Sequence, residues 1–192
     1  MDAYERSPGQ ILHESRIVYL SGDIATPSAE LVVQRILALD AIDHQAEIKL
    51  YLTSFGGSVH AGLAIYDAMQ LVEAPVSTFC LGAAFSMAAW LLAAGEPGRR
   101  FAAPNARIML HQASGGLMGT TADIQVAAEN MLQTERTMND LLARHTGRTS
   151  DAIRAAIQRD LWLTPTQAME FGLIDGVTQP AERKGFARGT TG

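Results

Sequence analysis

The feature that most constrains the fold is a run of 22 residues without a single charge, from Ala74 to Gly95. A transmembrane helix needs about 20 predominantly apolar residues, so the run is long enough to cross a bilayer. However, Pro75 lies near its start, Gly82 divides it, and its flanks show no excess of positive charge on one side. We therefore expect two buried elements, a strand over 76–81 and a short helix over 86–94.

Length and composition place these elements in one domain. The chain has 192 residues, of which 47% are hydrophobic and 18% charged, enough for a sizeable core. We expect 1–192 to form a single domain, loose over about 1–15 and 180–192. The net charge of −5 argues against nucleic acid as a partner. A single cysteine, Cys80, and an N-terminus without an apolar segment predict a cytoplasmic protein that does not enter membranes.

Predicted strands and helices alternate along the chain, with short glycine-marked turns between them. This order is typical of an α/β fold with a largely parallel sheet. Ser28 is the expected N-cap of one helix, in which Leu31, Arg35 and Leu39 mark the helical spacing. The predicted strands are 16–20, 47–52, 76–81 and 107–112, and the predicted shorter helices are 28–40, 61–73, 86–94, 150–159 and one from Thr164 to Gly172.

The segment 120–145 predicts a much longer helix. Thr120 and Asp123 form a capping signal, and Gly147 stands where a helix-ending glycine belongs. About 25 helical residues span roughly 37 Å, more than the diameter of a domain of this size. One end should therefore project, and we favour an oligomerisation element over a long core helix with solvated ends.

Metal and phosphate sites are the easiest chemistry to exclude. The closest two of the five histidines are 16 residues apart, so no metal-binding cluster such as H-x-x-x-H occurs. The glycine pairs lack the spacing of phosphate-binding and dinucleotide-binding loops. We therefore predict neither a metal nor a cofactor.

Ser86 is a candidate nucleophile. It lies between the predicted buried strand and helix, where free N–H groups and the positive end of the helix dipole are available to a developing oxyanion. The glycine-rich turn 54–58 is a second source of such a donor, because glycine allows the backbone to approach a ligand closely. A serine at a helix start is more commonly a cap, and a glycine pair is often a simple turn, so the pattern alone leaves both interpretations open.

A serine nucleophile needs a base. The only two lysines, Lys49 and Lys184, stand in a predicted strand and in the tail, which disfavours a Ser–Lys dyad. His111 ends an apolar strand, where catalytic residues of parallel sheets gather, although a structural histidine is common there too. The carboxylate that would orient its ring is Asp160, Asp151 or Asp175, and the apolar run after Asp160 favours the first.

Six stretches of sequence together resemble one family, the proteolytic subunit of the Clp protease (caseinolytic protease P). The resemblance covers about residues 11–177, and the stretches occur in the family's order and spacing. They are Ser54–Val59, Ala61–Met69, Gly82–Met87, Arg107–Gln112, Arg159–Thr164 and Glu170–Asp175.

The resemblance implies a Clp protease/crotonase-like fold, a mainly parallel sheet with flanking helices and a projecting handle helix. It implies Ser86 as nucleophile, His111 as general base and then acid, Asp160 as its orienter, and the backbone N–H groups of Gly57 and Met87 as oxyanion hole. Segments 57–59 and 112–116 would pair with an extended substrate; the implied substrate-binding residues are Ser58, Val59, Gln112, Gly115 and Gly116.

The resemblance also implies the assembly and the activity. Handle helices join two stacked seven-membered rings, homomeric or mixed with a paralogue, and an AAA+ ATPase unfoldase feeds them unfolded polypeptides. The sequence thus predicts a serine endopeptidase, with a non-catalytic or partner-dependent paralogous subunit and a crotonase-type acyl-CoA enzyme as alternatives. Phe55 and Phe85 stand where the family usually has Pro and Ala, and two bulky rings predict a narrower substrate pocket or a disturbed oxyanion hole.

Overall fold

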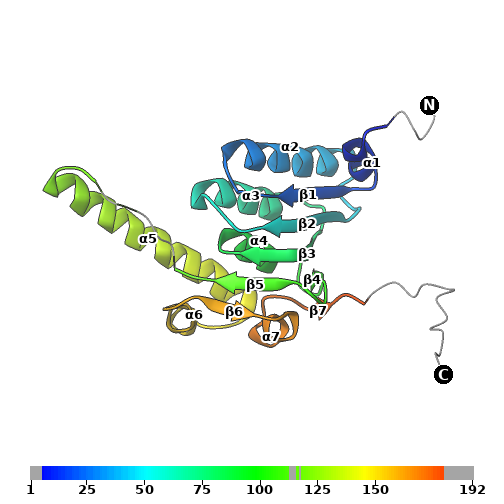
Figure 1. The fold of residues 1–192 in the computed structure, drawn as a ribbon. Helices are drawn as coiled ribbons and strands as arrows, with labels where there is room; N and C mark the ends of the chain where they lie inside the picture. Colours follow the sequence, from blue (N-terminus) through cyan, green and yellow to red (C-terminus); the bar gives the residue numbers. More distant parts are fainter. Residues whose placement is uncertain (1–5, 113–115, 117, 180–192) are drawn as a thin grey trace, which may run out of the picture.

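The protein is described by a computed structural model over residues 6–112, 116 and 118–179. Figure 1 shows its helices and strands in an α/β arrangement. In chain order the elements are α1 (Pro8–Glu14), β1 (Ile17–Ser21), α2 (Thr26–Ile42), β2 (Ile48–Ser54), α3 (Val59–Leu71), β3 (Val76–Phe85), α4 (Met87–Ala93), β4 (Arg100–Ala102), β5 (Arg107–Leu110), α5 (Thr121–Thr146), α6 (Ser150–Ala156), β6 (Leu161–Leu163), α7 (Pro165–Phe171) and β7 (Gly176–Val177).

The sheet is mainly parallel, as the alternation of elements predicted. The order β1-β2-β3-β4-β7 forms one path, and β5 leaves it by pairing with β3. The long strand β3 therefore has two partners on one side: residues 78–80 pair with β4, and residues 83–85 pair with β5. Among the strands of the described residues, β6 alone runs antiparallel, along the edge of β5. The carboxyl ends of β2, β3 and β5 consequently lie at the same edge of the sheet (Figure 1).

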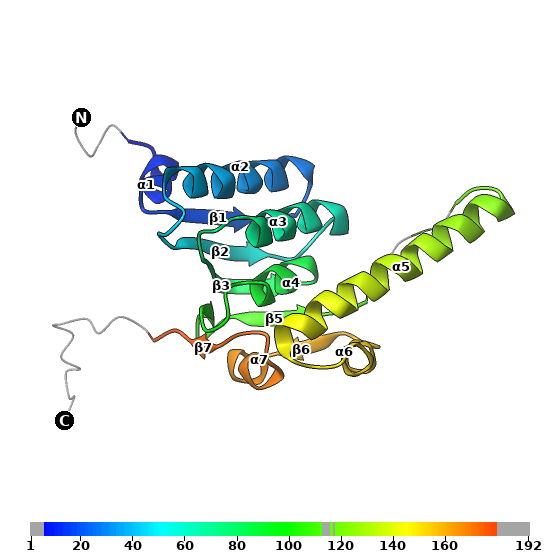
Figure 2. The same ribbon diagram turned by 180° about the vertical axis from the view of Figure 1, so that it is seen from behind.

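Helices α2, α3 and α4 pack on one face of the sheet, which Figure 2 shows from the helical side. The buried residues of α2 are Ala29, Val32, Ile36 and Leu39. This face differs from the predicted stripe, because Leu31 is exposed and the helix begins at Thr26 rather than after Ser28. Ser28 is the third residue of α2, and its Oγ accepts a hydrogen bond from the Ala25 backbone N–H at 3.0 Å.

The uncharged run 74–95 forms β3 and α4. The strand does not stop at Gly82, as the sequence suggested, but continues to Phe85. Gly82 adopts a φ of +74° inside the strand, at the point where β3 changes its partner from β4 to β5. Every residue of α4 is buried, which explains the absence of charge. Within the described residues, no helix combines the length and the apolar character needed to cross a membrane.

Helix α5 extends far beyond the body of the molecule, in agreement with the argument from its length (Figures 1 and 2). Thr120 and Asp123 cap its start, and Gly147 ends it with a φ of +70°. Three contacts hold its base: the Trp90 indole N–H donates to the Met138 carbonyl at 2.9 Å, the Arg100 guanidinium donates to the His145 carbonyl at 2.8 Å, and Tyr66 Oη lies 3.0 Å from His145 Nε2.

Two boundaries near the termini also differ from expectation. The N-terminal segment predicted to be loose contains α1, whose start carries a full capping box of Ser7 and Gln10 with Pro8 in the first turn. Helix α6 starts at Ser150, where the predicted helix 150–159 starts, but it ends at Ala156. Its N-cap is Thr149, whose hydroxyl accepts from the Ala152 N–H, and not Ser150, which the sequence also suggests as a cap. Helix α7 begins after Thr164 and ends at Gly172, as predicted. The tail 180–192 lies outside the described residues.

Candidate active site

Ser86 occupies a sharp turn between β3 and α4. Its φ of 51° and ψ of −134° form a conformation that costs a non-glycine residue about 1–3 kcal/mol, and such strain gathers at functional sites. Its side chain does not cap α4. Instead, Ser86 Oγ lies 2.7 Å from Nε2 of His111. The common interpretation of a serine at a helix start therefore does not apply here, since the hydroxyl is directed to an imidazole.

The sheet explains why residues 25 positions apart meet. Strands β3 and β5 are parallel neighbours in which Phe85 is paired with Met109, so the chain leaves both strands at the same edge. The Ser86 N–H donates to the Met109 carbonyl at 2.8 Å, which fixes the turn against β5. Both side chains are half-buried. The pair is therefore held by backbone pairing as well as by its own hydrogen bond.

Asp160 lies close to this pair without joining it. Strand β6 pairs antiparallel with β5 so that Leu161 is opposite Leu110, and the next position of this register sets Asp160 opposite His111. Asp160 is exposed, and no hydrogen bond or ion pair links it to the imidazole. The other two carboxylates considered from the sequence have different partners: Asp151 pairs with Arg154 and Asp175 with Arg100.

Gly56 brings the β2–α3 turn against Ser86, and Gly57 brings it against Ile24. A Cβ on Gly56 would stand 2.6 Å from Ser86 Cβ and 3.2 Å from the Met87 N, so only hydrogen fits there. Gly56 and Gly57 have φ angles of +97° and +150°, which favour glycine. Among the described residues, the N–H groups of Gly57 and Met87 have no acceptor. Backbone N–H groups without an acceptor near a serine hydroxyl are what an oxyanion hole requires.

A hollow opens beside Ser86 and His111. Its apolar walls come from α3, α4, the base of α5 and the end of α6, and its polar groups come from α5 and the segment after β5. The lining residues besides the pair are Val59, Met87, Trp90, Gln112, Glu135, Met138, Asn139 and Ile157. Two of the substrate-binding residues expected from the resemblance, Val59 and Gln112, are among them.

The other expected binding residues lie elsewhere or cannot be judged. Segment 57–59 is not a strand, since Ser58 is the N-cap of α3 and Val59 its first residue; only Gly57 forms an isolated bridge, to Ile24. Gly116 is exposed, and Gly115 lies outside the described residues. Among the described residues, no group of three or more metal-ligating side chains comes together.

A comparison with known families adds an independent finding. The sequence model of the Clp protease family matches residues 3–181 of the 192-residue chain. The chain belongs to the Clp protease family. Its mainly parallel sheet with flanking helices agrees with the Clp protease/crotonase-like fold. For a Clp protease family member, a serine paired with a histidine beside free backbone donors is an arrangement suited to acyl transfer from a peptide.

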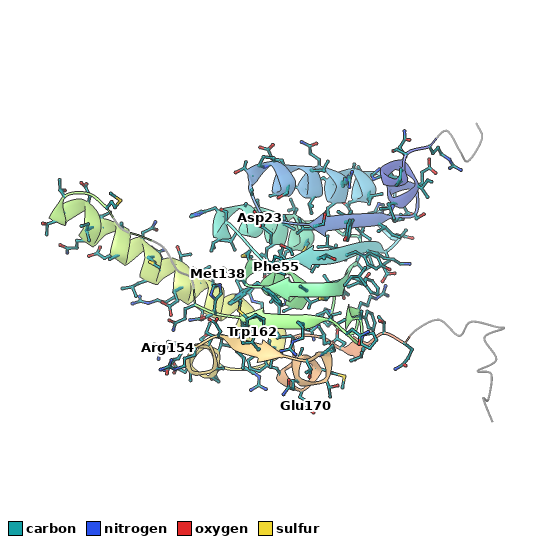
Figure 3. The ribbon with its side chains drawn as sticks, in the orientation of Figure 1. Asp23, Phe55, Met138, Arg154, Trp162 and Glu170 are labelled. Carbon is teal, nitrogen blue, oxygen red and sulfur yellow. The ribbon has the colours of Figure 1, made fainter. Side chains whose placement is uncertain are left out.

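Phe55 and Phe85, the two bulky residues that stand where the Clp protease family usually has Pro and Ala, do not line the hollow. Phe55 is 71% exposed, and its ring lies 5.2 Å from the Phe85 ring. The Phe85 ring in turn meets Trp162 edge-on at 5.0 Å. Figure 3 shows Phe55 and Trp162 on the side of the sheet turned to the viewer, away from the helices of Figure 2. Neither ring lines the hollow, because successive strand side chains alternate between faces and Phe85 points away from α4. The effect of the two rings on substrate binding and on the oxyanion hole stays a prediction.

Sequence reasoning missed the contribution of α5 to the site. Glu135, Met138 and Asn139 occur at helical spacing i, i+3 and i+4, so one face of α5 carries all three. That spacing is readable in the sequence, but nothing in it indicates that the base of α5 lies against Ser86. The sequence also did not distinguish Gly56 from Gly57, since only the packed structure shows which glycine lies against Ser86.

Proposed function

We propose that the protein is a serine endopeptidase subunit that hydrolyses unfolded polypeptides through an acyl-enzyme. The single observation that carries the proposal is the 2.7 Å hydrogen bond between Ser86 Oγ and His111 Nε2. The strained turn at Ser86 and the free N–H groups of Gly57 and Met87 give it further support. Membership of the Clp protease family makes peptide hydrolysis the natural reaction for this arrangement.

The reaction begins when His111 Nε2 accepts the Ser86 proton as Oγ attacks the peptide carbonyl carbon. The N–H groups of Gly57 and Met87 donate to the carbonyl oxygen as it becomes negative. His111 then gives its proton to the leaving amine, the C–N bond breaks, and an ester to Ser86 remains. Water activated by the same imidazole hydrolyses this ester and regenerates the hydroxyl.

Asp160 has the role of orienting His111 in this mechanism. Its position next in register to His111 supports that role, since rotation of an exposed carboxylate toward the imidazole Nδ1 needs no change in the β5–β6 pairing. A carboxylate at Nδ1 fixes the tautomer that leaves Nε2 free to accept a proton. We expect the carboxylate to reach Nδ1 when substrate or a neighbouring subunit orders this edge.

The assembly we propose is a barrel of two stacked rings, heptameric and homomeric or mixed with a paralogue. The support is α5, which projects from the body and exposes Ile124, Val126 and Leu132. Apolar residues exposed along a projecting helix need a partner to cover them. An AAA+ unfoldase would supply unfolded polypeptides to the closed chamber. The cytoplasmic location stays a prediction from the single cysteine.

A second candidate follows from one observation. No hydrogen bond or ion pair joins Asp160 to His111, so the isolated chain carries a dyad rather than a completed triad. A subunit that becomes active only beside a paralogue would have this property. A fluorophosphonate probe distinguishes the two: labelling of Ser86 in the purified chain favours the self-sufficient peptidase, and labelling only after mixing with a paralogous subunit favours the partner-dependent one.

The direct test is Ser86→Ala. We expect peptide hydrolysis to fall by roughly 10⁴- to 10⁶-fold, because no other group replaces the nucleophile. Native mass spectrometry should give the same oligomer for the variant as for the parent protein. Ser21→Ala, which changes an exposed serine at the end of β1, is the matched control and should leave hydrolysis unchanged. If Ser86→Ala still hydrolyses peptides at the rate of the parent protein, the proposal is wrong.

A further inference from the structure

The hollow beside Ser86 is small. Its volume is about 20 Å³. A cavity needs about 10–15 Å³ to hold one water molecule. The hollow therefore has room for a single small group, such as a methyl group, and not for a branched side chain of four carbons.

The apolar walls of the hollow are fixed by the packing behind them. Met87 is buried, and its side chain fills the space beside Gly62 of α3, where a Cβ on that glycine would collide with it. The Trp90 indole N–H donates to the Met138 carbonyl at 2.9 Å, which sets the base of α5 against α4. Met138 and Ile157 are buried as well. Since protein interiors are close-packed, these walls cannot retreat without displacing the core behind them.

The position of the hollow identifies the part of a substrate that meets it. Ser86 and His111 both belong to its lining. A peptide carbonyl carbon attacked by Ser86 must approach Oγ to about 3–3.5 Å. The Cα of the residue that contributes this carbonyl is bonded directly to the attacked carbon. The side chain of that residue, on the N-terminal side of the scissile bond, therefore enters the hollow.

We propose that the hollow restricts the residue on the N-terminal side of the scissile bond to alanine or a residue of similar size, and that Met138 sets this limit. An alanine methyl group fills the available volume, whereas glycine leaves it empty. A leucine side chain would enter only by displacing Met138 or Ile157, and overpacking of this kind is destabilising. The inference rests on the proposed function, because it names the substrate class of the same site.

Met138 is the wall residue best suited to a test. It lies where the base of α5 meets the body of the molecule (Figure 3). Replacement by alanine removes Cγ, Sδ and Cε and so enlarges the hollow. Met87 is unsuitable, because its backbone N–H is a donor of the proposed oxyanion hole.

The assay uses fluorogenic peptides that differ only at the residue before the scissile bond, with glycine, alanine, 2-aminobutyrate or leucine. We expect the parent protein to cleave after alanine with a kcat/KM about fourfold above that after glycine, the effect of burying one methyl group. Alanine should exceed leucine by about 10- to 100-fold. The rate of fluorophosphonate labelling, measured in parallel, reports the state of Ser86 independently of this preference.

In Met138→Ala the ratio of alanine to leucine should fall at least about tenfold, mainly because cleavage after leucine rises. Met131→Ala is the matched control, since it removes the same side chain from the same helix and Met131 does not line the hollow. It should keep the preference of the parent protein. Ile157→Val removes one methyl group from another wall and should raise cleavage after 2-aminobutyrate relative to alanine. This milder variant decides the matter if Met138→Ala does not fold.

Two results would overturn the inference while the peptidase activity stands. One is a parent protein that cleaves after leucine as well as after alanine. The other is an unchanged preference in a folded Met138→Ala, or in Ile157→Val where Met138→Ala does not fold. Absence of cleavage of every peptide, together with absence of fluorophosphonate labelling, overturns the proposed function itself and the inference with it.

Discussion

Replacing Gly56 by alanine tests how closely the β2–α3 turn sets the position of Ser86, the proposed nucleophile. The added Cβ would lie 2.6 Å from Ser86 Cβ and 2.9 Å from the Phe85 carbonyl oxygen. Ordinary contact begins at 3.4 Å, so the turn and the nucleophile must separate by about 0.8 Å. Neither neighbour can yield cheaply, because one is backbone and the other is the first side-chain atom of a strained residue.

The expected cost has two parts. The φ of +97° is unfavourable for alanine, which lowers stability by about 1–3 kcal/mol. The displacement of Ser86 acts on catalysis, since a misplacement of about 1 Å can reduce the rate about 10²-fold. Gly56→Ala should therefore lose about two orders of magnitude in peptide hydrolysis while remaining folded.

Gly98→Ala separates the two parts. Gly98 has a φ of +83°, and a Cβ there meets nothing within 4 Å, so this variant carries the backbone strain without the contact. Hydrolysis rate, fluorophosphonate labelling rate and thermal midpoint should be measured for both variants. If Gly56→Ala hydrolyses peptides within threefold of the parent protein, or if Gly98→Ala loses as much activity, the proposed packing of the turn against Ser86 is wrong.

Two further substitutions test the carboxylates. Asp160→Asn should lower kcat about 10²- to 10⁴-fold by favouring the wrong tautomer of His111, and an unchanged kcat would exclude the orienting role. Burial raises the pKa of Asp175, but hydrogen bonds from Arg100 outweigh it and hold the pKa below its ordinary value of 3.8. The pair therefore stabilises the fold above that value, and this contribution is lost as pH falls through the lower folded pKa. Asp175→Asn should lower the free energy of unfolding by about 3 kcal/mol at pH 7, measured by urea unfolding. It should also make this free energy fall less steeply with decreasing pH. The same dependence on pH below pH 4 in the variant and the parent protein would contradict this reasoning.

The fold was predictable where local chemistry repeats. The alternation of apolar runs with capped segments predicted the parallel sheet, and the capping signals of α5 and α7 marked their starts correctly. The errors have a common origin in tertiary context. A glycine such as Gly82 is typical of a strand end, yet β3 continues through it because its partner strand changes there from β4 to β5. No local pattern reports the presence of a second partner strand.

The site was predictable only in part, because its residues lie far apart along the chain and meet through the order of the strands. Ser86 and His111 could be proposed because each follows an apolar strand, and parallel strands end at one edge. Their 2.7 Å separation depends on the Phe85–Met109 pairing, which only the sheet order supplies. The place of Glu135 in the lining of the hollow was beyond reach, since it depends on where the base of a long helix is held by Trp90.

The two phenylalanines show why a substitution beside a catalytic residue in sequence need not act on it. Phe85 precedes Ser86, but the alternation of strand side chains sends it to the face opposite α4, while the turn at Ser86 reverses the chain toward His111. On that open face its ring packs between Phe55 and Trp162, so the large residue at one position provides the contact for the large residue at the other. A pair of rings that cover each other can replace smaller residues together without entering the hollow. The shape of the hollow is then set by α3, α4, α5 and α6, and it is there that differences in substrate preference should originate.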